Sequence, residues 1–229
     1  MNIALIPVRG GSKSIPLKNI KELNGKPLVY WTAKAASDAK CVDKVIVATD
    51  SEKIKNVVQN LKLNKVEVFE REAENASDTA STESVMLEYI NKSNLKAEDK
   101  FFLIQATSPL LTSEQIDLMY DKFIKSGADS IFSGVVEKQF HWFCKDGVRP
   151  VNYDYKNRPR RQEFEGLVAE NGACYINSVG NIKRDKCRLS GNITFFELPF
   201  SYEIDEEADW KIVEAIMKQG EKYENGSSL

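Results

Sequence analysis

The stretch "IALIPVRGGSKSIPLKNI" at residues 3–20 decides the fold, because an apolar run passes directly into a glycine-containing, cationic segment. Together with residue 2, the apolar part is short, hydrophobic on both faces and ended by turn residues, a pattern typical of a strand buried inside a parallel sheet. The cationic part then follows the carboxyl end of that strand. Open α/β sheets bind their ligands outside the carboxyl ends of their strands, so this loop is the first place to look for a site.

An alternation of strands and helices continues from this strand to about residue 137. Repeated βαβ units of this kind predict a parallel sheet with helices on both faces. The predicted strands cover 2–8, 44–50, 65–70, 101–106 and 130–136, and the predicted helices cover 28–39, 51–62, 81–93 and 112–127.

Local signals support the helix boundaries. Ser51 is a good N-cap residue. Thr112 and Gln115 have the spacing of a capping box, and Gly127 is placed to end the helix that they begin.

The alternation of strands and helices is no longer clear after residue 137. Residues 138–172 carry aromatic and charged side chains without a clear period, including the basic run "NRPRRQ" at 157–162. This segment is interpreted as an excursion from the sheet, a hairpin or small arm that could serve dimerisation. Residues 173–178 and 193–199 are predicted to return as strands, and 206–219 to form a closing helix. We therefore predict a single α/β domain over residues 1–229, with a Rossmann-like, mostly parallel sheet and an arm within about 138–172.

The composition restricts the classes of function. The chain has 229 residues, 42% of them hydrophobic and 29% charged, with a net charge of −2. This is the balance of an ordinary globular protein, and it lacks the broad basic face that nucleic-acid binding requires. The four cysteines are scattered and there is one histidine, so ligand spacing for a metal and a disulfide framework are both poorly supported. With neither a leader-like segment nor a membrane-length apolar stretch, a cytoplasmic protein with no nucleic-acid or membrane partner is expected.

The opening loop has the chemistry of a phosphate site. Gly10 and Gly11 allow backbone N–H groups to approach an anion, while Arg9, Lys13 and Lys18 supply positive charge. That combination suits a triphosphate. The chain contains neither GxxxxGK[ST] nor GxGxxG, so a P-loop NTPase and a dinucleotide-binding domain are not supported.

The longer pattern "IPVRGGSKSIPLKNI…NGKPLVYW" resembles the signature of the acylneuraminate cytidylyltransferases, enzymes that make CMP-activated sialic and related sugar acids. The segments "REAENASDTAST", "IQATSPLLT", "RRQEF…ENGACYIN" and "EIDEEADW" fit the same family in order, over nearly the whole chain. The sequence departs from the family at Ser14, where glycine is usual, and at Glu203, where the sialic-acid enzymes often have aspartate.

The resemblance implies a role for each matching residue. On the nucleotide side, these roles are the CTP phosphates for Arg9, Ser12, Lys13 and Lys18, the base or ribose for Asn19, and the cytidine pocket for Arg71, Ala80 and Ser81. Gly10 and Gly11 join the nucleotide-binding residues through their backbone N–H groups. Gln105 matches a position between nucleotide and sugar acid, and the sugar-acid side is matched by Arg161, Asn171 and Tyr175. Mg²⁺ would be held by Glu203 and Asp205. The residues expected to act in catalysis are Arg9, Lys18, Gln105 and Asp205.

The expected reaction transfers CMP from CTP to the anomeric hydroxyl of a nine-carbon 2-keto-3-deoxy sugar acid, with release of pyrophosphate, and the resemblance implies a homodimer. The acid could be N-acetylneuraminic acid or a bacterial analogue such as legionaminic or pseudaminic acid. An octulosonate enzyme is a further alternative, although that family carries a different loop in place of "QATSP". A module that binds CTP without turning it over is the alternative outside the enzymes.

Overall fold

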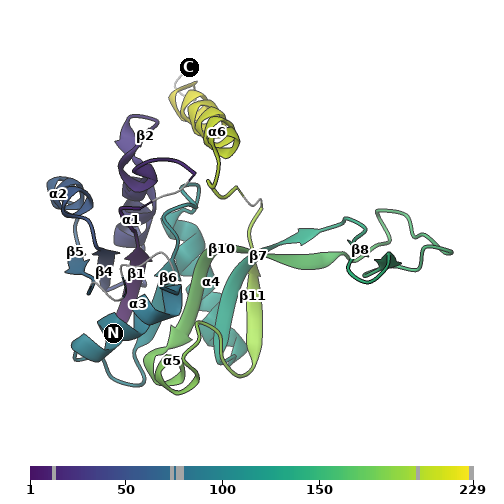
Figure 1. The fold of residues 1–229 in the computed structure, drawn as a ribbon, viewed down its shortest axis with the longest axis horizontal. Coiled ribbons are helices and arrows are strands. Elements are labelled where there is room, and N and C mark those ends of the chain that lie inside the picture. Colours follow the sequence, from purple (N-terminus) through teal and green to yellow (C-terminus); the bar gives the residue numbers. More distant parts are fainter. Residues whose placement is uncertain (12–13, 73–74, 76–79, 200–201, 227–229) are drawn as a thin grey trace.

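The computed structural model describes residues 1–11, 14–72, 75, 80–199 and 202–226 (Figure 1). Its centre is a seven-stranded sheet with the order β11-β7-β10-β6-β1-β4-β5. Strand β10 runs antiparallel to both of its neighbours, and the other four strand pairs are parallel, which confirms the predicted mostly parallel sheet. The strands are β1 (Asn2–Pro7), β4 (Lys44–Thr49), β5 (Val66–Glu70), β6 (Lys100–Ile104), β7 (Ser130–Glu137), β10 (Leu167–Ser178) and β11 (Ile193–Glu197).

Helices cover both faces of this sheet, as predicted. The helices are α1 (Leu28–Asp38), α2 (Glu52–Asn60), α3 (Thr82–Lys92), α4 (Ser113–Ser126), α5 (Val179–Asp185) and α6 (Glu207–Gly226). Ala4 and Ile6 of β1 share a hydrophobic cluster with residues of α1, α2 and α4, whereas Ile3 and Leu5 share another with residues of α3 and α5. Side chains alternate across a strand, so β1 is buried on both faces.

The predicted helix signals are confirmed in detail. The Ser51 hydroxyl accepts a hydrogen bond from the Ile54 N–H at the start of α2. Thr112 and Gln115 form a complete capping box at α4, and Gly127 ends that helix with a φ of 65°. A left-handed residue at this position is favourable for glycine because it has no Cβ.

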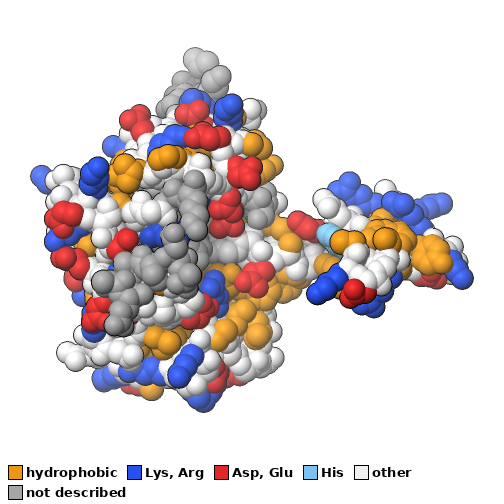
Figure 2. Space-filling model, in the orientation of Figure 1, with side chains coloured by type: hydrophobic (Ala, Val, Ile, Leu, Met, Phe, Trp, Pro, Cys, Tyr) orange, Lys and Arg blue, Asp and Glu red, His pale blue; other side chains and the backbone are white. Residues whose placement is uncertain are grey.

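The residues between β7 and β10 form an arm that projects far from the sheet (Figure 1). We call residues 138–166 the arm. The β7–β10 pairing leads into it, ending where Glu137 faces Leu167, and a small hairpin of β8 (Trp142–Phe143) and β9 (Arg149–Pro150) lies within it. Phe140 packs against Tyr153 with ring centroids 4.3 Å apart. Hydrophobic side chains gather along the arm between patches of Lys and Arg (Figure 2).

A third hydrophobic cluster joins the opening loop to the closing helix. Ile15 and Leu23 are buried there with Ile204 and Trp210. Leu23 belongs to a two-strand ribbon of β2 (Glu22–Leu23) and β3 (Lys26–Pro27), which follows the short 3-10 helix η1 (Lys18–Ile20). This contact brings together segments almost 190 residues apart. None of the helices in the described part of the chain combines the length and apolar character that a membrane crossing requires.

Candidate active site

A cleft of about 500 Å³ opens at the carboxyl ends of β1 and β6. These strands are parallel neighbours, so the residues that follow them meet at one edge of the sheet. Eight of the predicted site residues line the cleft: Arg9, Lys18, Asn19, Arg71, Ala80, Ser81, Gln105 and Asp205. The remainder of the lining is Pro7, Ser14, Thr82, Val85, Ala106 and Thr107.

Lys18 is an anchored charge in the wall of this cleft. Only 9% of the residue is exposed, and its Nζ donates a 2.8 Å hydrogen bond to the Ile204 carbonyl. The same Nζ lies 3.2 Å from Oδ1 of Asp205, whose side chain is 68% exposed. Lysine usually keeps its ammonium group in water, so burial beside one carbonyl and one carboxylate fixes this charge in place.

Asn19 and Gly10 shape the backbone of the opening loop. The Asn19 side-chain amide donates to the Arg9 carbonyl at 3.1 Å, and the Gly10 N–H donates to Oδ1 of Asp50 at 2.9 Å. A Cβ at Gly10 would lie 3.0 Å from the Cβ of Ser51, so this close approach favours glycine. Gly10 and the exposed Gly11 are not part of the cleft lining, and Ser12 and Lys13 lie outside the described residues.

Arg71 follows β5 and also lines the cleft. Its N–H continues the sheet by donating to the Thr49 carbonyl at 3.0 Å, and its guanidinium donates to the Asn75 carbonyl. The Nε of Arg71 is buried and has no hydrogen-bond partner among the described residues. A buried donor without a partner is costly, and such groups are rare in folded proteins.

The start of α3 completes the wall beside Arg71. The Ser81 hydroxyl accepts from the Ser84 N–H at 3.1 Å and so caps the helix. Val85, one turn further on, presents an apolar surface to the cleft, as Pro7 does from the end of β1. The cleft therefore combines cations with apolar walls, which complement the anionic phosphates and the base of a nucleotide.

The two acidic residues predicted to hold a metal differ in position. Asp205 lines the cleft, whereas Glu203 is half-buried next to it and accepts a 2.8 Å hydrogen bond from the Thr107 hydroxyl. Burial raises the pKa of Glu203, and the negative charge of Asp205 adds to that shift. No group of three or more His, Cys, Asp or Glu side chains that could hold a metal alone exists in the described residues. Two carboxylates fit Mg²⁺ when substrate phosphates supply further oxygen ligands, which is its usual mode of binding.

The predicted sugar-acid residues lie outside the lining of the cleft. Asn171 is buried, and its Oδ1 accepts a 2.7 Å hydrogen bond from the Ser133 hydroxyl. The Tyr175 hydroxyl donates to Glu170. Arg161 is exposed in the arm. The structure therefore does not bring these three residues together.

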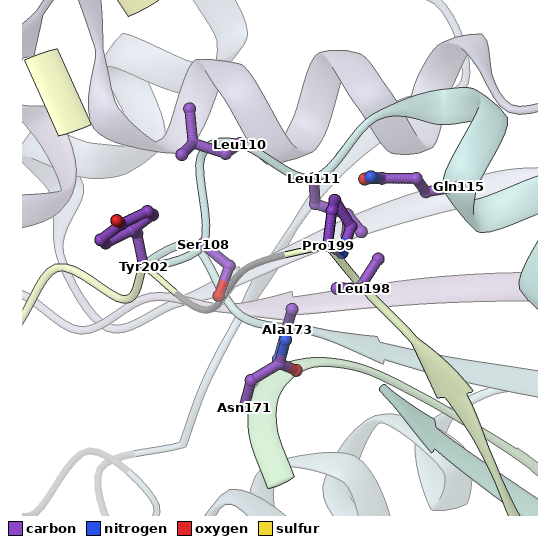
Figure 3. Close-up of a pocket in the computed structure, with 9 residues that line it drawn as sticks. All are labelled: Ser108, Leu110, Leu111, Gln115, Asn171, Ala173, Leu198, Pro199 and Tyr202. Carbon is purple, nitrogen blue, oxygen red and sulfur yellow. The ribbon is translucent and has the colours of Figure 1, made fainter. Parts of the chain in front are cut away.

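Asn171 does line a second, smaller hollow of about 20 Å³ next to the segment that follows β6 (Figure 3). Asn171 and Ala173 reach it from β10, while Leu110 and Leu111 close it from the opposite side. Its residues are Ser108, Leu110, Leu111, Gln115, Asn171, Ala173, Leu198, Pro199 and Tyr202.

Thr107 and Val85 line the cleft but were not predicted from the sequence. Thr107 stands within the quoted segment "IQATSPLLT", so its place after a buried strand was an available signal. Val85 carries no such signal, because an apolar residue on one face of a helix predicts core packing.

A mostly parallel sheet with a cationic cleft at the carboxyl ends of its strands defines an α/β nucleotide-binding protein. A family model described as Cytidylyltransferase matches residues 3–157, and the chain belongs to that family.

Individual relatives support the same assignment. The chain is 38% identical over 219 residues to a protein of Oncorhynchus mykiss named N-acylneuraminate cytidylyltransferase, covering 92% of this chain and 49% of that one. It is 27% identical to the Post-translational flagellin modification protein B of Campylobacter coli, over 95% of each chain. The chain thus spans about half the length of several N-acylneuraminate cytidylyltransferases that it matches.

The fold has solved counterparts. A structure of CMP:2-keto-3-deoxy-manno-octonic acid synthetase complexed with CTP superposes with a TM-score of 0.72, covering 96% of this chain and 99% of that chain at 17% identity. At that identity the likeness establishes the fold, and it confirms the predicted Rossmann-like class.

Proposed function

We propose that this chain transfers CMP from CTP to the anomeric hydroxyl of a nine-carbon 2-keto-3-deoxy sugar acid and releases pyrophosphate. The observation that carries the proposal is the convergence of Arg9, Lys18, Arg71 and Asp205 on one cleft at the carboxyl ends of β1 and β6. A cleft of about 500 Å³ is of the size that ligands of this class occupy. The relatives named N-acylneuraminate cytidylyltransferase, which match over 92% of the chain, support the choice of substrates.

The reaction requires little covalent chemistry from the protein. The sugar hydroxyl attacks the α-phosphorus of CTP, and the bond from that phosphorus to the bridging oxygen of pyrophosphate breaks. Catalysis then consists of positioning and of stabilising the charge that develops on the leaving group. Arg9 and the anchored Lys18 are placed for that charge, and Gln105 lies after β6 where nucleotide and acid would meet.

A magnesium ion is part of the proposal. Asp205, and Glu203 next to it, would hold Mg²⁺ together with phosphate oxygens, and the ion would supply neutralisation of the triphosphate charge. The contact of Lys18 Nζ with Oδ1 of Asp205 at 3.2 Å holds that carboxylate at the edge of the cleft.

The arm is the basis for proposing a homodimer. Trp142, Val148 and Tyr155 are 45%, 72% and 55% exposed on it. Large exposed apolar surface on a projecting segment is typical of a protein interface. The basic run that contains Arg161 lies on the same segment, so a second copy of the chain could carry Arg161 to the acid side of the cleft. We further propose a cytoplasmic enzyme, since its four cysteines are free thiols.

The test is pyrophosphate release by the purified protein with CTP and Mg²⁺ against a panel of N-acetylneuraminic, legionaminic, pseudaminic and octulosonic acids. ATP, GTP and UTP serve as controls for the nucleotide. Release that needs both CTP and one nine-carbon acid is the expected result, and it names the acid. CTP binding without release for any acid would contradict the enzyme assignment and favour a module that only binds CTP.

A further inference from the structure

Helix α3 carries a buried carboxylate that the proposed reaction does not use. Glu88 stands in the middle of the helix and is 7% exposed. Ionisable side chains are rarely buried unless other groups pair with them, because removal from water penalises the charge. The partners of Glu88 therefore indicate what it does.

The Glu88 carboxylate holds Glu72 and Asn75, two described residues of the segment between β5 and α3. One oxygen accepts hydrogen bonds from the Glu72 N–H at 2.8 Å and from Lys92 Nζ at 2.9 Å. The other oxygen accepts from the Asn75 side-chain amide at 2.7 Å. These bonds fix two points of the segment onto the helix that forms one wall of the cleft.

Asn75 connects Glu88 to Arg71 through hydrogen bonds. Its N–H donates to the Glu72 carbonyl at 3.0 Å, and its own carbonyl accepts from the Arg71 guanidinium. The orientation of the guanidinium therefore depends on Asn75, and the side chain of Asn75 is held by Glu88. The unpartnered Nε of Arg71 lies on that same positioned group.

Glu88 and Arg71 interact through their charges as well as through the hydrogen bonds of Asn75. Burial lowers the pKa of the Arg71 guanidinium. The negative charges of Asp50 and Glu88 oppose that shift, whereas the positive charge of Arg9 adds to it. Glu88 is therefore both a mechanical support for Arg71 and part of its countercharge.

We infer that Glu88 is a positioning residue for CTP recognition, acting on the nucleotide through Asn75 and Arg71. The inference rests on the proposed function, since it presumes that the cleft binds CTP. It assigns Glu88 no contact with the substrate. Its loss should weaken CTP binding while leaving the chemical step at saturating CTP nearly unchanged.

The test compares Glu88→Gln with the unmodified protein by calorimetric titration of CTP in the absence of any acid, and by steady-state pyrophosphate release with the best acid. Glutamine keeps the size of the side chain but turns one acceptor into a donor that faces other donors. We expect CTP to bind about tenfold more weakly, the scale of one charge-assisted hydrogen bond. The KM for CTP should rise in parallel, with kcat within about twofold.

Two further variants separate positioning from general stability. Lys92→Met removes a 42% exposed partner of the same carboxylate, which pairs with Glu72 and Glu88, and should leave CTP binding within about twofold. If Glu88 acts through Arg71, then Arg71→Met combined with Glu88→Gln should bind CTP no more weakly than Arg71→Met alone. Effects that multiply in the double variant would overturn the inference, because Glu88 would then act independently of Arg71.

The remaining outcomes are also decisive. If Glu88→Gln does not fold, Asn75→Ala breaks the same link without burying a new donor, and it should weaken CTP binding several-fold. Normal CTP binding by a folded Glu88→Gln, or by Asn75→Ala in its place, overturns this inference and leaves the proposed function intact. Failure of the unmodified protein to bind CTP overturns both.

Discussion

The cleft and the arm are built in opposite ways. In the cleft, charges are held by buried contacts, as in the 2.8 Å hydrogen bond from Lys18 to the Ile204 carbonyl. On the arm, Trp142 and Val148 are largely exposed and Arg161 faces solvent. In the cleft, the side chains of Lys18 and Asn19 are already held by hydrogen bonds within the chain. The arm presents apolar surface and positive charge on the face that Figure 2 shows.

This contrast suggests that the two substrates are recognised by different means. A preorganised set of charges suits a triphosphate, because the groups that stabilise the leaving pyrophosphate must not reorganise during the reaction. The predicted acid side is divided between β10, which holds Asn171 and Tyr175, and the arm, which holds Arg161. We propose that one chain suffices for CTP and that two are needed for the sugar acid.

The largest effect is expected from a substitution in the cleft. Arg9→Ala should lower turnover by roughly two to three powers of ten, the scale for losing one preorganised charge-stabilising group. Pyrophosphate release at saturating substrates measures it. Lys26→Ala, which removes a cation from the same region but outside the cleft lining, is the control and should stay within about twofold. A folded Arg9→Ala with near-normal turnover would remove Arg9 from the catalytic residues.

The next effect tests the arm. Arg161→Ala should reduce turnover by about tenfold to a hundredfold through loss of a charged contact to the acid, with CTP binding unchanged. If the arm serves the neighbouring chain, mixing Arg161→Ala with Arg9→Ala should restore activity, because one site of each mixed dimer is then intact. Random exchange would give about a quarter of the unmodified activity. Sedimentation that finds only monomers, or mixtures with no recovered activity, would contradict this division of roles.

A smaller effect concerns an ion pair between the nucleotide side and the predicted acid side of the site. Arg188 Nε donates to Glu83 at 2.6 Å, with both side chains about three-quarters buried, and the Arg188 guanidinium lies 5.1 Å from the ring centroid of Tyr175. The ion pair ties the start of α3 to the segment between α5 and β11, and the contact of Arg188 with Tyr175 extends this link to β10. Glu83→Gln should lower the free energy of unfolding by about 1–3 kcal/mol at neutral pH, measured by urea denaturation.

The same pair has a predictable pH dependence. Burial raises the pKa of Glu83, but the hydrogen bond from Arg188, a backbone hydrogen bond and the positive charge of Arg188 together outweigh it, and the pKa lies below its ordinary value of 4.5. A lowered pKa in the folded state stabilises the protein above the unfolded value, and that contribution is lost as pH falls through the folded value. The difference between Glu83→Gln and the unmodified protein should therefore be largest at neutral pH and shrink below pH 4.5. A constant difference across that range would contradict the ion pair.

The sequence predicted most of the fold because the signals are local. The run at 2–8 is apolar on both faces, and Thr112, Gln115 and Gly127 mark a helix within 16 residues. The helix α5 was missed, since a helix of 7 residues is too short to show a 3.6-residue period. Elements that depend on distant packing, such as η1 and the ribbon after it, have no local pattern of comparable strength.

The candidate site likewise contains residues whose placement could be predicted from the sequence and contacts that could not. The placement of Arg9 and Gln105 at neighbouring strand ends could be predicted, because parallel strands bring their carboxyl ends to one edge. The contact of Lys18 with Ile204 joins residues 186 positions apart, and nothing near either residue indicates it. The partners of Asn171 and Tyr175 within β10 and β7 could not be predicted either, since they depend on how the two strands are aligned.

The smallest expected effect concerns Ser14, which stands where the resembled family usually has glycine. Its hydroxyl donates a 2.5 Å hydrogen bond to the Asp205 carbonyl, so it ties the opening loop to the acidic segment across the cleft. Ser14→Ala removes that bond and should lower the free energy of unfolding by about 1 kcal/mol. Ser14→Gly should cost about 0.5–1 kcal/mol more, because glycine loses more backbone freedom on folding. Urea denaturation of both variants separates the bond from the backbone. Turnover should change less than threefold in either, because the charged groups of the cleft keep their other contacts; a large loss in Ser14→Ala alone would instead make this hydroxyl part of the catalytic geometry.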